Sequence, residues 1–178
     1  MPLRTWPLIL LLVGLAGFAT TASATDLTGR ASVIDGDTIE IHGKRIRLFG
    51  IDAPEGGQLC DDAKGKAYRC GQVAALALAD EIGSVTVKCE QRDTDRYKRV
   101  VAICRVGDLE LNRWLVSKGL AVEYRKYSGG RYRDAEEEAK GDGRGLWAGR
   151  FEWPWKWRVN RRRKGTPDRR VKGALTHF

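Results

Sequence analysis

The chain has 178 residues and a formal net charge of +9, with 32 Lys and Arg residues against 23 Asp and Glu residues. This length suits one domain with a core of its own, and the only long apolar run lies at the N-terminus, which excludes a protein with several membrane spans. Residues 156–178 hold nine basic residues and one acidic residue, whereas residues 25–155 hold 22 of each. The basic character therefore belongs to the C-terminal segment.

The first residues have the pattern of an export signal. Arg4 precedes an apolar run over residues 7–19, and Ala22-Ser23-Ala24 follows it. A basic start, a short apolar centre and a small-residue end are typical of a secretory signal peptide. An uncleaved membrane anchor is the alternative. We expect residues 1–24 to be a signal peptide and the protein to be exported, periplasmic or secreted, with no stable membrane span after cleavage.

The stretch over residues 33–55, VIDGDTIEIHGKRIRLFGIDAPE, predicts a β-hairpin. Polar and apolar side chains alternate over residues 38–42, as in a half-buried strand, and residues 45–51 form the returning strand. The glycine between these strands suits a tight turn. Asp37 precedes the first strand and Asp52 follows the second, so antiparallel pairing brings the two carboxylates together.

Two neighbouring carboxylates repel one another, and a hard divalent cation stabilises both in the ionised form. Calcium accepts carboxylate and backbone carbonyl oxygens as ligands. Pro54 holds Ala53 extended and so fixes the direction of the Ala53 carbonyl, a third candidate ligand beside Asp37 and Asp52. We expect an open, weak Ca²⁺ site. The same residues also suit an ordinary turn and loop start.

Four cysteines in an exported chain predict two disulfides. Cys60 and Cys70 enclose a loop of nine residues, while Cys89 and Cys104 lie in two runs of alternating apolar residues on either side of a charged loop. Antiparallel pairing of these runs places Cys89 opposite Cys104. We expect the pairs Cys60–Cys70 and Cys89–Cys104. A zinc site is the alternative, but the chain has no C-x-x-C pair and its two histidines lack ligand spacing.

Three segments have helical periodicity. Residues 71–82 place apolar side chains at i, i+3, i+4 and i+7 and are followed by glycine. Residues 111–118 carry a shorter apolar stripe. A third helix over residues 132–140 contains four acidic residues that we expect to face solvent. These are Asp134, Glu136, Glu137 and Glu138.

Candidate nucleic-acid contacts follow the second strand pair. Arg99 ends the charged loop and opens a strand, which is a rigid position for a guanidinium that binds two phosphate oxygens at once. Tyr124 and Tyr127 suit stacking on bases, with packing on the barrel as the alternative. Aromatic and basic residues interleave over residues 153–158, which suits single-strand binding or docking of the tryptophans against the body.

The basic C-terminal segment centres on residues 161–164, RRRK. Such a run is typically irregular and attracted to polyanions. We therefore expect residues 156–178 to be an irregular basic tail that binds nucleic acid; a tail that only aids solubility is the alternative. No internal repeat and no second domain are evident.

Three motifs occur in order along the chain: VIDGDT, RLFGIDAPE and TDRYKR. Together they resemble the staphylococcal nuclease (thermonuclease) family over about residues 31–147. The resemblance implies an α+β, mainly β fold, a five-stranded OB-like barrel with three helices. It also implies calcium-dependent cleavage of phosphodiester bonds. Asp37 and Asp52 match the metal carboxylates, and Ala53, a backbone carbonyl ligand, stands where the family often has threonine.

The resemblance also assigns the reacting groups. Glu55 resembles the candidate general base, and Arg47 and Arg99 resemble the two phosphate-binding arginines. Arg96 and Tyr97 fall at positions that the family uses near the nucleotide.

We therefore expect residues 25–155 to form a monomeric, calcium-dependent endonuclease domain. The resemblance implies that it cleaves both DNA and RNA and leaves 3′-phosphate ends. A different class of protein, a barrel that binds nucleic acid without cutting it, is the main alternative. A structural protein held by its disulfides is a third, and predicts no affinity for nucleic acid.

Overall fold

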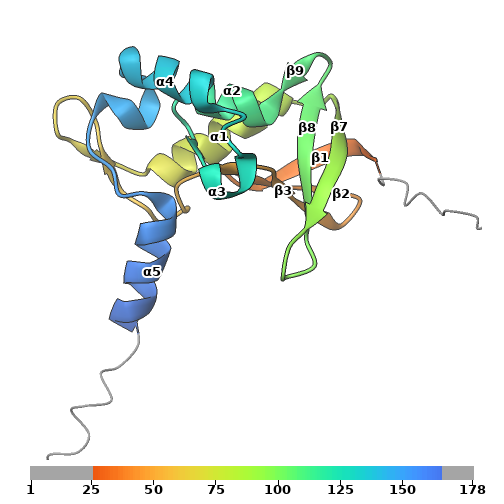
Figure 1. Cartoon of the computed structure of the whole chain (residues 1–178), viewed down its shortest axis with the longest axis horizontal. Coiled ribbons are helices and arrows are strands. Elements are labelled where there is room, and N and C mark those ends of the chain that lie inside the picture. Colours follow the sequence, from red (N-terminus) through yellow and green to blue (C-terminus); the bar gives the residue numbers. More distant parts are fainter. Residues whose placement is uncertain (1–25, 166–178) are drawn as a thin grey trace, which may run out of the picture.

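The computed structural model describes residues 26–165 of the chain (Figure 1). The predicted signal peptide, residues 1–24, and residues 166–178 of the predicted tail lie outside the described residues. Within residues 26–165, no helix is long and apolar enough to cross a membrane.

A five-stranded barrel forms the body of the protein. Its strands are β1 (Leu27–Asp35), β2 (Thr38–Ile41), β3 (Lys44–Leu48), β7 (Thr86–Thr94) and β8 (Val100–Val106). They follow the order β3-β2-β1-β7-β8 with antiparallel neighbours, and a parallel pairing of β3 with β8 closes the sheet. The predicted OB-like barrel is confirmed.

Short strands extend or flank this barrel. β9 (Leu109–Glu110) adds to the edge of β8, β4 (Ile51–Asp52) pairs with β10 (Val122–Glu123), and β5 (Cys60–Asp61) pairs with β6 (Ala67–Tyr68). Asp52, a candidate metal ligand, lies in the separate β4–β10 pair, which fixes its backbone outside the sheet of the barrel.

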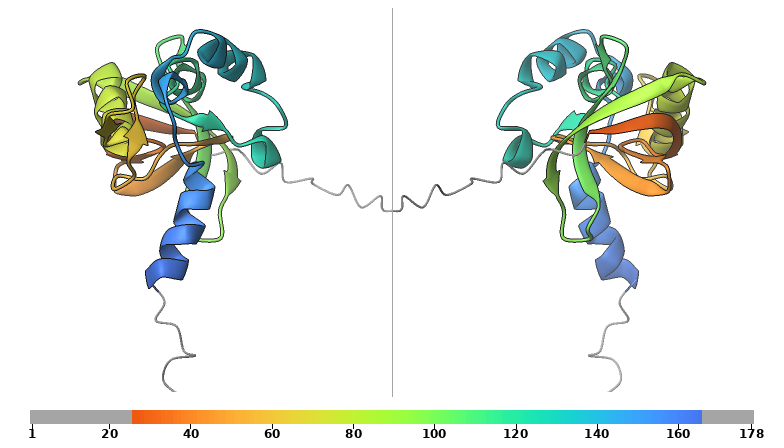
Figure 2. Two further views of the ribbon diagram at one scale, coloured as in Figure 1. Left: turned by 90° about the vertical axis from the view of Figure 1, so that its left-hand side faces the viewer. Right: turned by 90° about the vertical axis from the view of Figure 1, so that its right-hand side faces the viewer.

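The three predicted helices are present as α1 (Cys70–Ile82), α2 (Leu111–Ser117) and α4 (Arg133–Gly141). The described residues also form the single turn α3 (Arg125–Ser128), the 3₁₀ turn η1 (Gly145–Ala148) and helix α5 (Pro154–Gly165). Figures 1 and 2 show α5 projecting from the body on the side opposite α4.

Helix α5 changes the expectation for the basic segment, because residues 156–165 are helical and not irregular. Pro154 opens the helix at a position where proline costs no hydrogen bond. The ring of Trp155 then stacks on the ring of Tyr124, with centroids 5.2 Å apart and planes within 6°. This aromatic docking gives the basic helix an anchor that charge alone does not provide.

The main core lies inside the barrel and under α1 and α2. Ile39, Ile41, Ile46 and Leu48 alternate inward along the β2–β3 hairpin and are at most 1% exposed. A second cluster surrounds the buried Cys60, Cys70, Val122 and Leu146, and Trp147, Phe151, Trp153 and Trp155 pack against it. This second cluster supports the segment that leads into α5.

Both predicted disulfides are present. Cys60 is bonded to Cys70, with Cα atoms 5.7 Å apart, and joins β5 to the first residue of α1. Cys89 and Cys104 face each other across the β7–β8 pair, with Cα atoms 4.0 Å apart. All four cysteines are buried.

We predicted that the acidic residues of the third helix face solvent. This prediction is wrong for Glu136, which is 2% exposed. Its Oε1 accepts a hydrogen bond from the Glu123 amide at 3.0 Å, and its Oε2 lies 2.9 Å from the Lys140 ammonium. Glu137 and Glu138 are exposed as expected. The difference arises because α4 packs against α2 and β10, so one acidic position must turn inward and find partners.

Candidate active site

The β2–β3 hairpin brings the first two candidate residues together. His42 and Gly43, both with positive φ, form a two-residue turn that pairs Thr38 with Arg47. Beyond the last pair, the Asp37 carbonyl accepts the Leu48 amide at 2.8 Å. The chain then turns through residues 49–50 into β4, which ends at Asp52.

The Asp37 carboxylate is held by the backbone that follows β4. Its Oδ2 accepts a hydrogen bond from the Ala53 amide at 3.0 Å, so residues 16 apart in sequence are in direct contact. Asp37 and Asp52 are buried, with side chains 4% and 0% exposed. The juxtaposition predicted from the hairpin is present.

Arg47 bridges these two carboxylates. One guanidinium nitrogen lies 2.8 Å from Asp37 Oδ1 and the other lies 2.6 Å from Asp52 Oδ1. Burial by itself lowers the pKa of Arg47, but the charges of Asp37 and Asp52 outweigh it and raise the pKa above its ordinary value. Arg47 therefore stays charged and holds the carboxylates in a fixed mutual arrangement.

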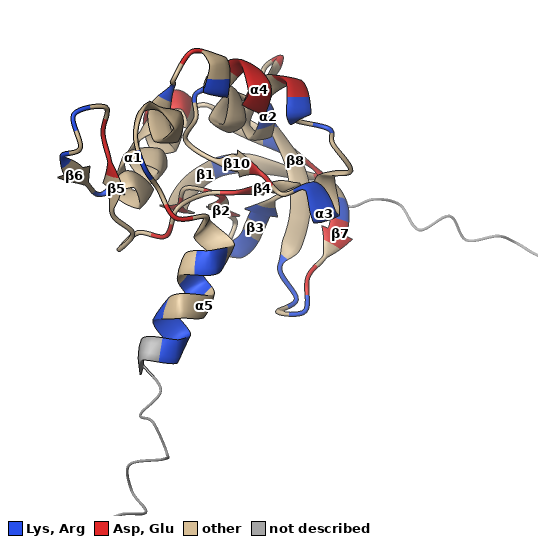
Figure 3. Cartoon of the chain, turned by 60° about the vertical axis from the view of Figure 1, so that its left-hand side comes forward, with Lys and Arg blue, Asp and Glu red and all other residues tan. Residues whose placement is uncertain are grey.

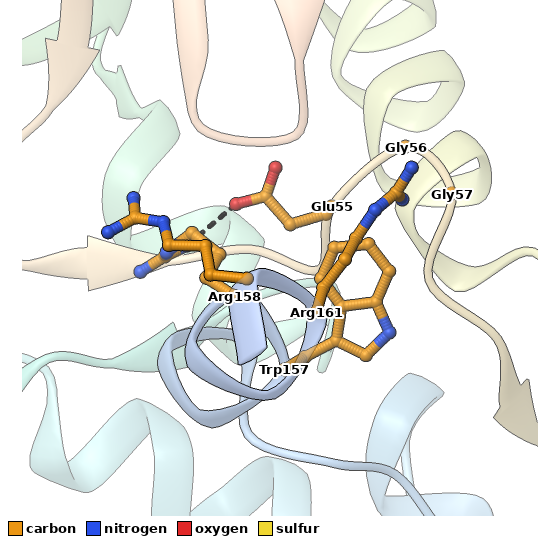
Figure 4. A pocket seen from close by; sticks show the side chains of 7 residues that line it. Glu55, Gly56, Gly57, Trp157, Arg158 and Arg161 are labelled. Atoms are coloured by element: carbon orange, nitrogen blue, oxygen red, sulfur yellow. Dashed lines mark hydrogen bonds and ion pairs between the residues drawn. The ribbon is translucent and has the colours of Figure 1, made fainter. Parts of the chain in front are cut away.

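A second arginine enters the site from helix α5. Arg158 Nη2 donates to both oxygens of Asp52, at 2.8 and 3.0 Å, and Nη1 donates to Glu55 Oε1 at 2.8 Å. Figure 4 shows this guanidinium beside the Glu55 carboxylate. Burial lowers the pKa of Arg158, but the hydrogen bond to Asp52 and its charge raise it overall. No pattern in the sequence around Arg158 marked it as a site residue.

Burial and neighbouring negative charge disfavour the ionised forms of Asp52 and Asp35 in spite of the two arginines. Burial raises the pKa of Asp52, and the nearby Asp37 adds to the effect, while the hydrogen bond from Arg158 opposes it. Burial and the charge of Asp37 also raise the pKa of Asp35 to about 6. Three aspartates thus share one region, which favours the binding of positive charge.

Glu55 sits on a loop that is fixed from two sides. Gln58, fully buried, accepts the Glu55 amide on its Oε1 at 3.3 Å and donates from Nε2 to the Glu152 carbonyl at 2.6 Å. On the other side, Gly71 of α1 lies so close that a Cβ there would come within 2.0 Å of the Glu55 carbonyl oxygen. The Glu55 side chain itself is 36% exposed and so accessible to water.

Arg99 lies at the neighbouring corner of the barrel. The parallel pairing of β3 with β8 sets Arg47 beside Val101, two residues beyond Arg99. Arg99 Nε donates to Asp95 Oδ2 at 2.8 Å, and its guanidinium carbon lies 5.6 Å from the Tyr97 ring centre. The structure therefore brings Arg47 and Arg158, but not Arg99, into contact with the carboxylates.

The remaining predicted substrate residues lie on the β7–β8 loop and in or just before α3. Tyr97 is 60% exposed, and the guanidinium of Arg96 lies 4.8 Å from its ring centre. Tyr127 is 55% exposed and meets Tyr124 edge-to-face at 4.8 Å. Tyr124 stacks on Trp155, so it follows the packing alternative on that face and supports α5.

The site residues missed from the sequence are Arg158 and Gln58. The interleaved aromatic and basic residues over 153–158 were a signal for docking of this segment, but nothing local indicated which arginine points inward. Gln58 had no signal, because its role depends on a carbonyl 94 residues away.

The fit of a metal ion to this site depends on Asp37 and Asp52. Among residues 26–165, no group of three or more His, Cys, Asp or Glu side chains is arranged to hold a metal ion. The two aspartates and a backbone carbonyl offer hard oxygen ligands, which suit calcium. Because Arg158 occupies both Asp52 oxygens, a cation that binds Asp52 has to displace it. The oxygen ligands fit calcium, and its binding requires the displacement of Arg158 from Asp52.

Comparison with known proteins identifies the family. A family model described as staphylococcal nuclease homologue matches residues 45–149, more than half of the chain. The chain belongs to the staphylococcal nuclease family. Membership makes it a nuclease, a hydrolase of phosphodiester bonds. Helix α5 lies beyond the matched residues of this staphylococcal nuclease homologue.

Several relatives are similar over most of their length. The succinoglycan biosynthesis protein ExoI of Rhizobium meliloti is 43% identical over 141 residues, covering 78% of this chain and 74% of the relative. The micrococcal nuclease of Shigella flexneri is 34% identical over 145 residues, covering 71% and 76%. An uncharacterized endonuclease of Haemophilus influenzae is 32% identical over 122 residues, covering 65% and 63%.

Proposed function

We propose that this staphylococcal nuclease homologue is a calcium-dependent endonuclease that acts on DNA and RNA and leaves 3′-phosphate ends. The observation that carries the proposal is the convergence of two buried aspartates, Arg47 and the accessible Glu55 at one edge of the barrel. The names of the nuclease relatives support the substrate class. The disulfides support an exported, oxidising location, and we propose that the protein acts there as a monomer.

Asp37, Asp52 and the carbonyl of Ala53 are the proposed calcium ligands. A calcium ion held there supplies positive charge that polarises the phosphate and lowers the cost of attack. The buried aspartates contribute their own part by being preorganised: Arg47 and the Ala53 amide hold them in place before any ligand arrives. Because the protein supplies only two carboxylates and one carbonyl, we expect calcium to bind weakly and to exchange.

Glu55 is the proposed general base or positioning group for the attacking water. It lies at the mouth of the site, its backbone is fixed by Gln58, and its carboxylate keeps access to solvent. A carboxylate there accepts the proton of water as the new P–O bond forms and the P–O5′ bond breaks, and the departing 5′ oxygen takes a proton from solvent. Arg158 binds its Oε1 in the structure, so the second oxygen, Oε2, takes this role.

Arg47 and Arg99 are the proposed donors to the phosphate oxygens, on which negative charge develops during attack. Arg47 is already at the carboxylates, and Arg99 is held at the next corner of the barrel by Asp95. Arg96, Tyr97 and Tyr127 are the proposed substrate-binding residues, whereas Tyr124, also expected to bind substrate, stacks on Trp155 and supports α5 instead. Of these, Tyr97 and Tyr127 offer the most exposed rings for stacking.

The proposal is tested by digestion of plasmid DNA and of a single-stranded RNA with calcium and with excess chelator. The expected result is cleavage that requires calcium, and products that need phosphatase treatment before their 3′ ends can be extended. Glu55→Gln should lower kcat by roughly 10²–10⁴ and remove the base-dependent rise in rate with pH. Cleavage that persists in chelator contradicts the calcium requirement.

A barrel that only binds nucleic acid is the second candidate, and one observation favours it. Arg158 takes both oxygens of Asp52 and one of Glu55, which leaves the reacting groups paired. This candidate predicts retention of plasmid DNA in a gel without cleavage at any calcium concentration.

A further inference from the structure

A cavity of about 340 Å³ opens beside Glu55, with residues 55–57 on one wall and α5 on the other (Figure 4). Binding pockets for small ligands typically begin at roughly this size. Its α5 wall lies outside the family match at residues 45–149. Its chemistry therefore depends on residues of α5 that the family match does not include.

The α5 wall is held firmly against the body. Trp155 stacks between Tyr124 and Trp153, with ring centres 5.2 and 4.9 Å away. Asn160 also hydrogen-bonds the Glu152 carboxylate, so these contacts hold α5 in place even when a metal ion displaces Arg158 from Asp52. The cavity is therefore formed before any ligand binds, which reduces the ordering cost of binding.

The charge of the cavity selects an anion. Arg158, Arg161 and Arg162 line it, and its acidic lining residue, Glu55, is already paired with Arg158. Arg96, and more weakly Arg162, lower the pKa of the exposed Tyr97, which places this end of α5 near the β7–β8 loop. Figure 3 shows Lys and Arg residues along α5, which projects from the body.

The planar groups that line the cavity favour a ligand that contains a flat ring. The Arg161 guanidinium carbon lies 5.0 Å from the ring centre of Trp157, so the two planar groups lie together on the helix. Opposite them are Gly56 and Gly57; a Cβ at Gly57 would come within 3.2 Å of Arg161, whereas one at Gly56 would meet nothing within 4 Å. Unpaired bases stack on such indole and guanidinium planes.

We propose that this cavity binds the nucleotide that adjoins the scissile phosphate, in single-stranded DNA or RNA. Arg161 binds the phosphate of that nucleotide and Trp157 stacks on its base. The proposal rests on the proposed nuclease function, since it takes Glu55 as the boundary between the reacting phosphate and this subsite. Only an unpaired base reaches the indole, so the subsite favours single strands over duplex.

The test measures binding of a fluorescent deoxytetranucleotide to the full protein in excess chelator, which prevents metal-dependent cleavage. Arg161→Gln and Trp157→Ala should each weaken binding about tenfold. Arg161→Gln should also reduce the slope of log affinity against log salt by roughly 0.7, the value for one phosphate contact on a single strand. Arg163→Gln is the matched control, because it removes the same charge from an exposed position of α5 that does not line the cavity.

Trp157→Phe keeps an aromatic face and should retain most of the affinity, which separates stacking from a fault in helix docking. If wild type cleaves plasmid DNA while Arg161→Gln and Trp157→Ala bind the probe as Arg163→Gln does, the subsite is overturned and the proposed function stands. If wild type neither cleaves nor binds, the proposed function fails, and the subsite fails with it.

Discussion

One guanidinium nitrogen of Arg158, Nη2, contacts both carboxylate oxygens of Asp52 across a sequence separation of 106 residues. The Asp52 side chain is fully buried and that of Arg158 is 27% exposed. The pair brings a cationic group from the C-terminal helix to the carboxylate that we propose as a calcium ligand. Arginine and calcium therefore compete for the same two oxygens.

The first prediction follows from this competition. Arg158→Gln removes a positive charge and its hydrogen bonds from Asp52, and each such bond to a charged group is worth about 1.5–3 kcal/mol. Calcium binding, measured by titration calorimetry without nucleic acid, should tighten about tenfold. Arg163→Gln, the same substitution elsewhere on α5, should leave it unchanged. Equal calcium affinity in Arg158→Gln and wild type would show that Arg158 does not compete with calcium for Asp52.

The second prediction separates the metal ligand from the phosphate donor. Asp37→Asn removes one of two metal carboxylates and should raise the calcium concentration for half-maximal rate. Arg99→Lys keeps the charge but loses the planar fork, so it should lower kcat by roughly a hundred- to a thousandfold with a normal calcium midpoint. The measurement is a calcium titration of initial rates on one DNA substrate. A shift of the calcium midpoint alone in Arg99→Lys would contradict its assigned role.

Asp95 supports the third prediction. Burial opposes its ionisation, but hydrogen bonds from the Arg99 amide, the Arg99 side chain and the Tyr97 amide lower its pKa overall. A carboxylate with a lowered folded-state pKa adds stability above its unfolded pKa of 3.8, and this stability is lost as the pH falls through the folded value.

Asp95→Asn should therefore reduce the free energy of unfolding by about 1 kcal/mol at pH 7. The difference from wild type should disappear in acid, and urea unfolding at a series of pH values measures it. Asp93→Asn is the control, because Asp93 is exposed near the end of β7, two residues before Asp95. A difference that stays constant down to pH 2 would mean that the charge of Asp95 contributes nothing.

The fourth prediction concerns the buried Glu136. Glu136→Ala leaves the Glu123 amide without its acceptor and removes the partner of Lys140, so it should lower the free energy of unfolding by about 2–3 kcal/mol. Glu137→Ala, one residue along on the exposed side of α4, should change it by less than about 0.5 kcal/mol. Urea denaturation of both variants measures the contrast, and equal values would place Glu136 on the surface.

The fifth prediction concerns the disulfide between β7 and β8. Replacing Cys89 and Cys104 together by alanine should lower the free energy of unfolding by about 2–5 kcal/mol, because it removes a cross-link and buried volume from the barrel. Peptide mapping without reductant tests the pairing itself, and a Cys60–Cys89 peptide would contradict it. The double variant unfolding with wild-type stability would show that the cross-link is dispensable.

Features that depend on neighbouring residues could be predicted from the order of residues alone. Alternation over residues 38–48 set the hairpin, and the hairpin fixed that Asp37 and Asp52 would meet, because antiparallel strands leave their ends together. The same reasoning paired Cys89 with Cys104, which lie symmetrically about one loop. Periodicity and chain direction are local properties, so they can be read from the order of residues.

Which distant groups share a site depends on how the helices and strands pack together. Nothing near Arg158 indicates that it reaches Asp52, because its position depends on Trp155 packing against Tyr124 of another segment. Glu136 was expected in solvent because the sequence does not distinguish it from its acidic neighbours. Only the packing of α4 against α2 and β10 shows that it is the buried one. Burial of a charge depends on partners that the whole fold supplies, and those partners are not neighbours in the chain.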